Sequence, residues 1–269
     1  MRVLVAPDKF AGTLTAVEAA EAIAEGWRRR SPGDEIDLAP MSDGGPGFVD
    51  VLHAATGGDL VVVTVTGPLG EPTPATLLLD GPTAYVESAQ ACGLQLTGGE
   101  GVEVASTVGV GQLVGAAVDA GATTVVVGLG GSGTNDGGAG LLHALGATAD
   151  GRLDAGPLRL SDVTSVDLGP ARERLAGVTL VAASDVDSPL TGLFGATKTF
   201  GPQKGLDEGR IALVDGLLEQ LAVATDRRLS LEKGAGAAGG LGFALMLLGA
   251  TREPGIDLVA AAVDLEARA

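Results

Sequence analysis

The stretch TTVVVGLGGSGTNDGG, residues 123–138, joins a short β-branched run to a polar loop that is rich in glycine. The run at 123–127 is typical of a buried strand, because β-branched side chains pack well on a pleated surface. The loop at 128–138 contains six glycines together with Ser, Thr, Asn and Asp. Ligands of α/β proteins bind at loops that follow strands in this way. The stretch therefore predicts an α/β fold with a site at this loop.

The N-terminal residues alternate between short strands and helices. Residues 2–6 and 36–40 are apolar runs with the length of a buried parallel strand. Between them, Thr15 and Glu18 have the spacing of a capping box, which begins a helix. A second helix, over 47–56, ends at a pair of glycines. This alternation predicts a first α/β unit with parallel strands.

The pattern changes near residue 60. Three β-rich runs, at 60–66, 73–79 and 83–88, are separated by the turn sequences GPLGEP and DGP. They predict an antiparallel meander, and hence a second α/β domain that differs from the first. Further along we expect helices at 111–120, 207–224 and 237–248, a strand at 179–183, and mainly loops over 148–177.

The composition excludes several classes of protein. The net charge of −17 disfavours nucleic acid as a partner, because phosphate contacts supply most non-specific affinity for nucleic acid. The single cysteine, Cys92, excludes an internal disulfide, and we expect a small buried residue in a cytoplasmic protein. No membrane partner is expected either, because the uncharged stretch 234–251 contains six glycines and predicts a close-packed buried helix.

Four polar clusters follow or flank the predicted strands. They are residues 6–10, 41–45, 128–138, and 183–187 together with 200–205. Because ligands sit outside the carboxyl ends of strands in open α/β sheets, these positions predict a ligand site. In the cluster 128–138, successive backbone N–H groups and the start of the next helix would bind a phosphate. The alternative interpretation is a plain turn between a strand and a helix.

The same cluster contains the pattern G-x-G-x-x-G at Gly128, Gly130 and Gly133. This pattern leaves a dinucleotide-binding oxidoreductase as an alternative. Such a fold requires a further strand, ending in an acidic residue about 20 residues later. Residues 147–154 form a turn-like sequence instead, so the context argues against this alternative.

Asp185 and Asp187 come directly after the predicted strand at 179–183. Alternate residues of an extended chain point to the same side, so both carboxylates can face one Mg²⁺. One of them can instead accept the proton of an attacking hydroxyl, and the remaining interpretation is a solvated turn. The chain contains no Walker A motif, and neither histidine stands in a catalytic pattern.

In their order and spacing the clusters resemble the glycerate kinase family over essentially the whole chain. The matching segments are 7–10 (PDKF), 43–47 (DGGPG), 66–70 (TGPLG), 130–140 (GGSGTNDGGAG), 185–187 (DVD), 200–205 (FGPQKG) and 234–240 (GAGAAGG). The resemblance implies ATP-dependent phosphorylation of glycerate, commonly at the 2-hydroxyl, with Mg²⁺. It also implies a doubly wound, flavodoxin-like domain with a second, mixed α/β domain inserted. We place the first at 1–59 and 237–269 and the inserted one at 60–236.

The leading hypothesis is therefore a glycerate kinase. Asp185 and Asp187 would act as proton acceptor and Mg²⁺ ligand. Two further groups would bind substrate or phosphate. The first is Asp8, Lys9, Asp43, Gly44 and Gly45, and the second is Gly130, Gly131, Ser132, Asn135, Asp136 and Lys204. Which of the two groups binds ATP and which binds glycerate stays open at this point.

The chain departs from the family pattern at three places. Ala11 stands where the family often has Lys, and residues 46–48 read Pro-Gly-Phe where it often has Glu-Gly-Thr. The family also continues past the position of Ala269. These departures leave a second hypothesis, a catalytically impaired, truncated homologue that binds a small anion or a partner chain. From two parallel strands with open edges we also expect a homo-oligomer or a partly unfolded first domain.

Overall fold

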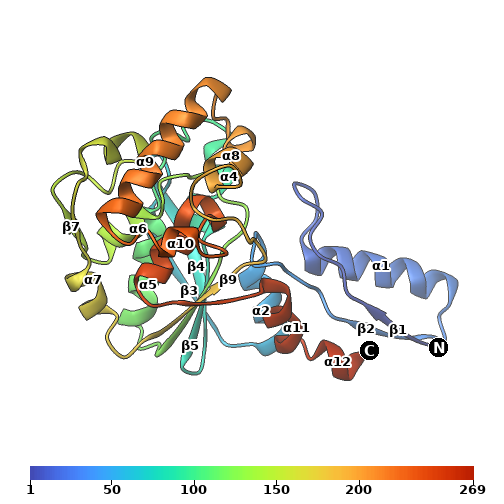
Figure 1. The fold of residues 1–269 in the computed structure, drawn as a ribbon. Helices are drawn as coiled ribbons and strands as arrows, with labels where there is room; N and C mark the ends of the chain where they lie inside the picture. The colour runs from blue at the N-terminus through green and yellow to red at the C-terminus, as the bar shows by residue number, and fades with distance from the viewer.

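The computed structural model describes residues 1–269, and its main feature is one six-stranded sheet (Figure 1). The strands, in spatial order, are β10 (Thr251–Glu253), β9 (Thr179–Ala183), β6 (Thr124–Gly128), β5 (Thr83–Glu87), β4 (Pro72–Asp80) and β3 (Asp59–Thr66). Strands β3, β4 and β5 pair antiparallel, which confirms the predicted meander. Strands β5, β6, β9 and β10 pair in parallel, so the sheet is mixed and the α/β class is confirmed.

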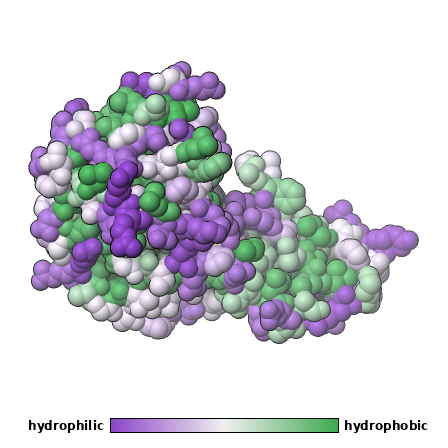
Figure 2. All heavy atoms as spheres, viewed as in Figure 1, coloured by the Kyte–Doolittle hydropathy of each residue, from purple (hydrophilic) through white to green (hydrophobic).

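A smaller unit projects from the side of this sheet (Figure 1). Its strands β1 (Arg2–Val5) and β2 (Glu35–Leu38) pair only with each other, in parallel. Helix α1 (Ala16–Arg30) connects them and begins at the predicted capping box, in which the Glu18 amide donates to Thr15 Oγ1 at 3.1 Å. Hydrophobic residues gather on the visible surface of this unit (Figure 2).

Helices cover both faces of the large sheet. Val125 and Val127 of β6 belong to the larger core with α5 (Val108–Asp119), α6 (Ala139–Ala144), α9 (Ile211–Ala224) and α10 (Leu241–Leu247). Val126 and Val181 point the other way and belong to a smaller core with α2 (Phe48–Thr56) and α11 (Gly255–Ala262). Successive strand residues face opposite sides of a sheet, so one β-branched run supplies both cores.

The remaining elements are short. They are the helices α3 (Ala89–Cys92), α4 (Leu94–Thr97), α7 (Gly169–Arg174), α8 (Ala196–Phe200) and α12 (Leu265–Arg268), and the antiparallel pair β7 (Thr148–Ala149) and β8 (Val166–Asp167). None of the helices has both the length and the apolar character of a membrane span. Cys92 is fully buried, as predicted, and burial raises the pKa of its thiol to about 12.

The helix predicted over 237–248 is broken in the structure. Ala238 and Gly239 have φ angles of 50° and 69°, so a 3₁₀ turn at Ala237–Gly240 precedes α10. The physical reason is that the backbone at Gly239 lies close to the glycine-rich loop. A Cβ atom at Gly239 would collide with the carbonyl oxygen of Thr134 in that loop. The turn therefore packs its backbone against the predicted site.

The division into domains at 1–59 with 237–269, and 60–236, stays a proposal. In the structure α11 contacts α2, whereas α10 contacts α6 and β10 pairs with β9 of the large sheet. Residues 237–253 therefore pack with the large sheet and not with the smaller unit. We propose that the last segment of the first domain begins after β10.

Candidate active site

Two glycine-rich loops meet at the carboxyl ends of the central strands. Gly44 has a φ of 90°, and a Cβ atom there would lie 2.9 Å from the carbonyl oxygen of Ala183, the last residue of β9. A Cβ atom at Gly130 would lie 2.5 Å from the Cα atom of Gly45. Side chains would therefore push the two loops apart. The structure thus brings the predicted clusters 41–45, 128–138 and 183–187 together.

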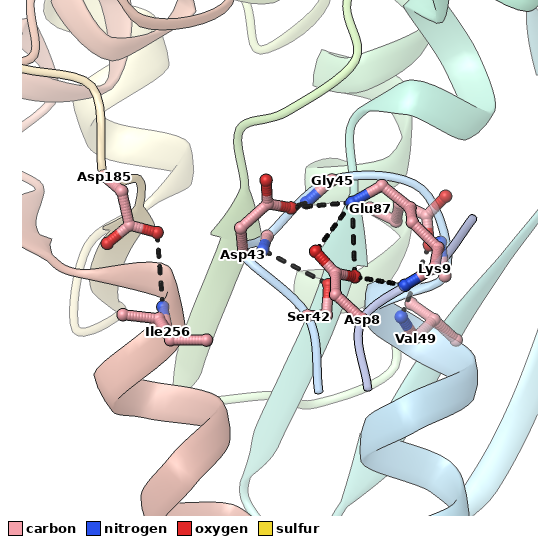
Figure 3. Close-up of polar contacts among 11 residues, drawn as sticks. Asp8, Lys9, Ser42, Asp43, Gly45, Val49, Glu87, Asp185 and Ile256 are labelled. Carbon is pink, nitrogen blue, oxygen red and sulfur yellow. Dashed lines mark hydrogen bonds and ion pairs between the residues drawn. The ribbon is translucent and has the colours of Figure 1, made fainter. Parts of the chain in front are cut away.

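Lys9 and two carboxylates line one side of this meeting point (Figure 3). The Lys9 ammonium lies 3.0 Å from the Asp43 carboxylate and 3.4 Å from that of Asp8. Burial by itself lowers the pKa of Lys9, but the bonds to Asp43 and Asp8 outweigh it and the pKa is raised. For Asp43, burial by itself raises the pKa. The bonds from Lys9 and from the Gly45 amide outweigh this effect, so the pKa of Asp43 is lowered overall. Lys9 and Asp43 are therefore charged at neutral pH.

Asp185 lies on the side of Asp43 that is away from Lys9 (Figure 3). Its carboxylate accepts a hydrogen bond of 3.3 Å from the amide of Ile256 in the first turn of α11. Burial raises the pKa of Asp185, and the negative charges of Asp43 and Asp257 raise it further. The charge of Asp43 therefore acts on Asp185, although Lys9 at 3.0 Å partly compensates Asp43 and Arg252 partly compensates Asp185.

Asp187 points to different partners. One of its oxygens lies 2.6 Å from the Arg252 guanidinium and the other lies 3.0 Å from the Lys233 ammonium. Lys233 and then Arg252 lower the pKa of Asp187. Asp185 and Asp187 therefore do not face one common ligand, although they are two residues apart, because Arg252 of β10 holds the second carboxylate.

The donor set suits Mg²⁺ better at Asp43 and Asp185 than at Asp185 and Asp187. The structure contains no group of three or more His, Cys, Asp or Glu side chains placed to hold a metal ion. Mg²⁺ in phosphoryl-transfer sites is commonly held by one or two carboxylates together with phosphate oxygens and water. Two carboxylates that repel each other fit that pattern, because a divalent cation between them would relieve the repulsion.

The glycine-rich loop is organised from inside by Asp136. This carboxylate is fully buried and accepts hydrogen bonds from the amides of Gly138 and Gly140 and from the amide and hydroxyl of Thr107, at 2.8–3.2 Å. Burial raises its pKa, against these hydrogen bonds. Asn135 is also fully buried and donates to Thr197 Oγ1. Both residues were predicted to bind a ligand, and the structure instead places their side chains beneath the loop as its support.

Lys204 approaches the same loop from the opposite side. Its side chain is only 2% exposed, and its ammonium donates to Ser132 Oγ at 2.8 Å and to the Thr134 carbonyl at 2.7 Å. Burial lowers its pKa to about 8 against the opposing effect of the Asp136 charge, and Asp136 is not close enough to form an ion pair with it. Together with Gly130 and Gly131 it lines a pocket of about 130 Å³. A buried ammonium without an ion-pair partner is an effective site for an anion.

A larger cleft of about 530 Å³ lies on the other side of Pro46. A Cβ atom at Gly131 would lie 2.7 Å from the Pro46 ring, so Pro46 and Gly131 stand between the two cavities. The cleft is lined by Lys9, by residues 11–15, and by Glu87 at the end of β5. Glu87 was not among the site residues predicted from the sequence. The available signal was an acidic residue inside the apolar run at 83–88.

Comparison with known proteins shows which proteins the chain is similar to. A sequence model of the Glycerate kinase family matches residues 3–269. Among curated proteins, Glycerate kinase from Bacillus subtilis (strain 168) is 42% identical and Glycerate 2-kinase from Escherichia coli (strain K12) is 40% identical, each over 99% of this chain and 73% of the relative. A solved structure from Salmonella typhimurium LT2, assigned to glycerate kinase 2, matches with a TM-score of 0.86 and 38% identity, over 100% of this chain and 75% of that one.

Two mycobacterial relatives have no assigned function. An uncharacterized protein from Mycobacterium bovis and one from Mycobacterium tuberculosis are each 46% identical over 97% of this chain. The chain spans 65% of the length of these two proteins. With the family model matched over nearly every residue, the chain belongs to the glycerate kinase family.

Proposed function

We propose that the protein transfers a phosphoryl group from ATP to a hydroxyl of glycerate. Family membership and the names of the relatives support the reaction. The observation that supports it most in the structure is the buried Lys204 ammonium, which has no ion-pair partner and borders the glycine-rich loop. Phosphoryl transfer needs positive charge and N–H donors around the transferred group, because negative charge spreads over its oxygens.

The two cavities support a division of the ligands. The pocket at Gly130, Gly131 and Lys204 would bind phosphate oxygens, with Ser132 keeping the ammonium in place. Asp8, Lys9, Asp43, Gly44 and Gly45 would form the wall on the glycerate side. Lys9 would also replace the cation that Ala11 removes from the family pattern. The E. coli relative is named Glycerate 2-kinase, which favours the 2-hydroxyl as the acceptor.

Mg²⁺ would be held by Asp185 and Asp43, where it would neutralise charge on the phosphate oxygens. For Asp187, predicted as a second catalytic carboxylate, the geometry favours a positioning role. Its ion pair with Arg252 connects the loop at 184–187 with β10, and its ion pair with Lys233 holds the other carboxylate oxygen, so that the loop that carries Asp185 is kept in place.

The alternatives receive less support. The glycine pattern at Gly128, Gly130 and Gly133 leads into α6, and the next strand, β7, pairs only with β8 outside the large sheet. A dinucleotide fold would need the next strand within that sheet. The hypothesis of an impaired homologue rests on residues 11 and 46–48 and on the part of the family pattern that follows the position of Ala269. The chain spans 65–73% of the length of the relatives named above, and Pro46 has a structural role against Gly131. A homo-oligomer and a cytoplasmic location stay predictions.

Product analysis tests the proposal. Incubation with ATP, MgCl₂ and D-glycerate should give ADP and a phosphomonoester whose ³¹P NMR signal matches 2-phosphoglycerate. A matched incubation with glycerol, which lacks the carboxylate, should give no phosphomonoester above background. ATP consumption without any phosphoglycerate would count against the proposal, and so would saturable quenching of NADH fluorescence.

A further inference from the structure

Glu87 lies at the carboxyl end of a central strand, beside the larger cleft. It is the last residue of β5 and lies in register with Gly128, the last residue of β6, at the point where the glycine-rich loop begins. Its carboxyl group borders the cleft of about 530 Å³ that Lys9 borders from the opposite unit. Glu87 therefore lines the cleft on the glycerate side of the proposed site, although the residue is only 4% exposed.

The start of α2 holds the carboxyl group in one orientation. The amides of Gly47 and Val49 donate to Oε2 at 3.0 Å and 3.3 Å. Neither bond uses Oε1, so this oxygen can bond to a group in the cleft, where the side chain of Gln90 is a neighbouring donor. A catalytic side chain has to be held in a fixed orientation, because a poorly oriented group accelerates the reaction much less.

The charges around Glu87 keep it near its point of titration. Burial raises its pKa and so does Asp50 on α2, whereas the two amides and the side chain of Gln90 on α3 lower it; the net pKa is about 7. Lys9 after β1 and Glu18 on α1 are the other charged groups of the cleft. A proton acceptor works best when its pKa lies close to the working pH.

We infer that Glu87 accepts the proton of the hydroxyl that becomes phosphorylated, an inference that rests on the function proposed above. The hydroxyl O–H bond breaks and its proton goes to Glu87 Oε1. The oxygen forms a bond to the γ-phosphorus while the bond from that phosphorus to the ADP oxygen breaks. The carboxylic acid then releases the proton to water. Asp187 is a weaker candidate, because its ion pairs hold its pKa low.

The variant Glu87→Gln separates this role from a structural one. The amide oxygen of Gln can still accept from Gly47 and Val49, so the cap on α2 remains while the proton acceptor is lost. We expect kcat to fall by about 10²-fold or more, the range for lost acid–base assistance, with KM changed less than fivefold. The wild type should lose kcat/KM below about pH 7, and Glu87→Gln should lack this limb. Glu87→Asp should retain the limb at a reduced rate. A kcat within threefold of the wild type in Glu87→Gln, or an intact acid limb, would overturn the inference.

A direct titration keeps the inference separate from the proposed function. With ¹³C-labelled Glu side chains, the NMR signal that Glu87→Gln removes should titrate near pH 7 and should shift when D-glycerate is added. Asp50→Asn should move its midpoint to lower pH, because one neighbouring negative charge is gone. An ordinary glutamate midpoint near 4.3 that ignores glycerate would overturn the inference. If the wild type releases no ADP with glycerate, the proposed kinase activity fails. In that case a glycerate-sensitive titration near pH 7 still supports Glu87 as the acceptor that faces the bound hydroxyl.

Discussion

The ammonium nitrogen of Lys204 lies 2.8 Å from the hydroxyl oxygen of Ser132, and no carboxylate forms an ion pair with it. Two of its three N–H donors are used, by Ser132 and by the Thr134 carbonyl. The third is available to the pocket that the glycine-rich loop borders. Burial disfavours the charged form of Lys204, and a bound anion would favour it. Anion binding and the protonation of this lysine are therefore coupled.

We expect this coupling to appear as proton uptake. Because the pKa of Lys204 is lowered to about 8, most molecules of the free protein carry a neutral lysine at pH 9. Calorimetry of tripolyphosphate binding at pH 9, in two buffers of different ionisation enthalpy, should show uptake approaching one proton per site. Lys204→Met should bind more weakly and take up no proton. Equal proton uptake in both proteins would place the anion elsewhere.

Glu87 should make the protein less stable as pH rises from about 4.5 to about 7. Its pKa is raised from 4.5 to about 7, so within this range the folded state keeps a proton that the unfolded chain has released. Stability falls with pH wherever the folded state binds more protons. Relative to the wild type, Glu87→Gln should gain free energy of unfolding between pH 5 and pH 8, on the order of 3 kcal/mol. Urea unfolding at both pH values measures this, and a pH-independent difference would contradict the raised pKa.

Asp185 and Asp187 should differ in the effect of the same substitution. Asp185→Asn removes half of the carboxylate pair and should lower kcat by about 10²-fold while weakening the dependence on Mg²⁺. Asp187→Asn breaks exposed ion pairs, and such pairs contribute about 1 kcal/mol or less. Its kcat should stay much closer to that of the wild type. A larger loss of kcat in Asp187→Asn than in Asp185→Asn would restore Asp187 as the metal ligand or proton acceptor.

Position 131 should tolerate a side chain less well than position 177, where a glycine has similar backbone geometry. Gly131 and Gly177 have φ angles of 69° and 81°, but only Gly131 has close neighbours, with a Cβ position 2.7 Å from Pro46. Ala at either site meets the cost of a left-handed conformation, about 1 kcal/mol. Gly131→Ala should in addition displace Pro46 and weaken nucleotide binding severalfold, and Gly177→Ala should not. Equal nucleotide affinity in the two variants, measured by calorimetry, would favour the plain-turn interpretation of the loop.

Local patterns in the sequence predicted local structure well. The strands of the meander and the capping box at Thr15 and Glu18 are set by neighbouring residues, and both are confirmed. The break at Ala238 and Gly239 was missed, because it is caused by packing against Thr134, about a hundred residues away along the chain. Glycine-rich sequence in that region indicated close packing but not a change of helix direction.

The candidate site was predicted as a set of residues, and their roles depended on contacts between distant segments. The pairing of Asp187 with Arg252 spans 65 residues, and it separates Asp187 from Asp185. Glu87 accepts from the amide of Gly47, 40 residues earlier, so no local motif marks it. The burial of Asp136 could not be predicted from the sequence either, because Asp is usually found on the surface. Its buried position is explained by the hydrogen bonds that it accepts from Thr107 and from the loop amides.

The central claim is that the buried Lys204 and the glycine-rich loop bind the phosphate that is transferred to glycerate. The most direct test is steady-state ADP release with ATP, MgCl₂ and D-glycerate, for the wild type and Lys204→Met in parallel. The wild type should release ADP only when glycerate is present, and Lys204→Met should retain its fold by circular dichroism while losing about 10²-fold or more in kcat/KM for ATP. Glycerate-dependent ADP release at equal kcat/KM in the two proteins would contradict the account, and so would a wild type whose ADP release does not depend on glycerate.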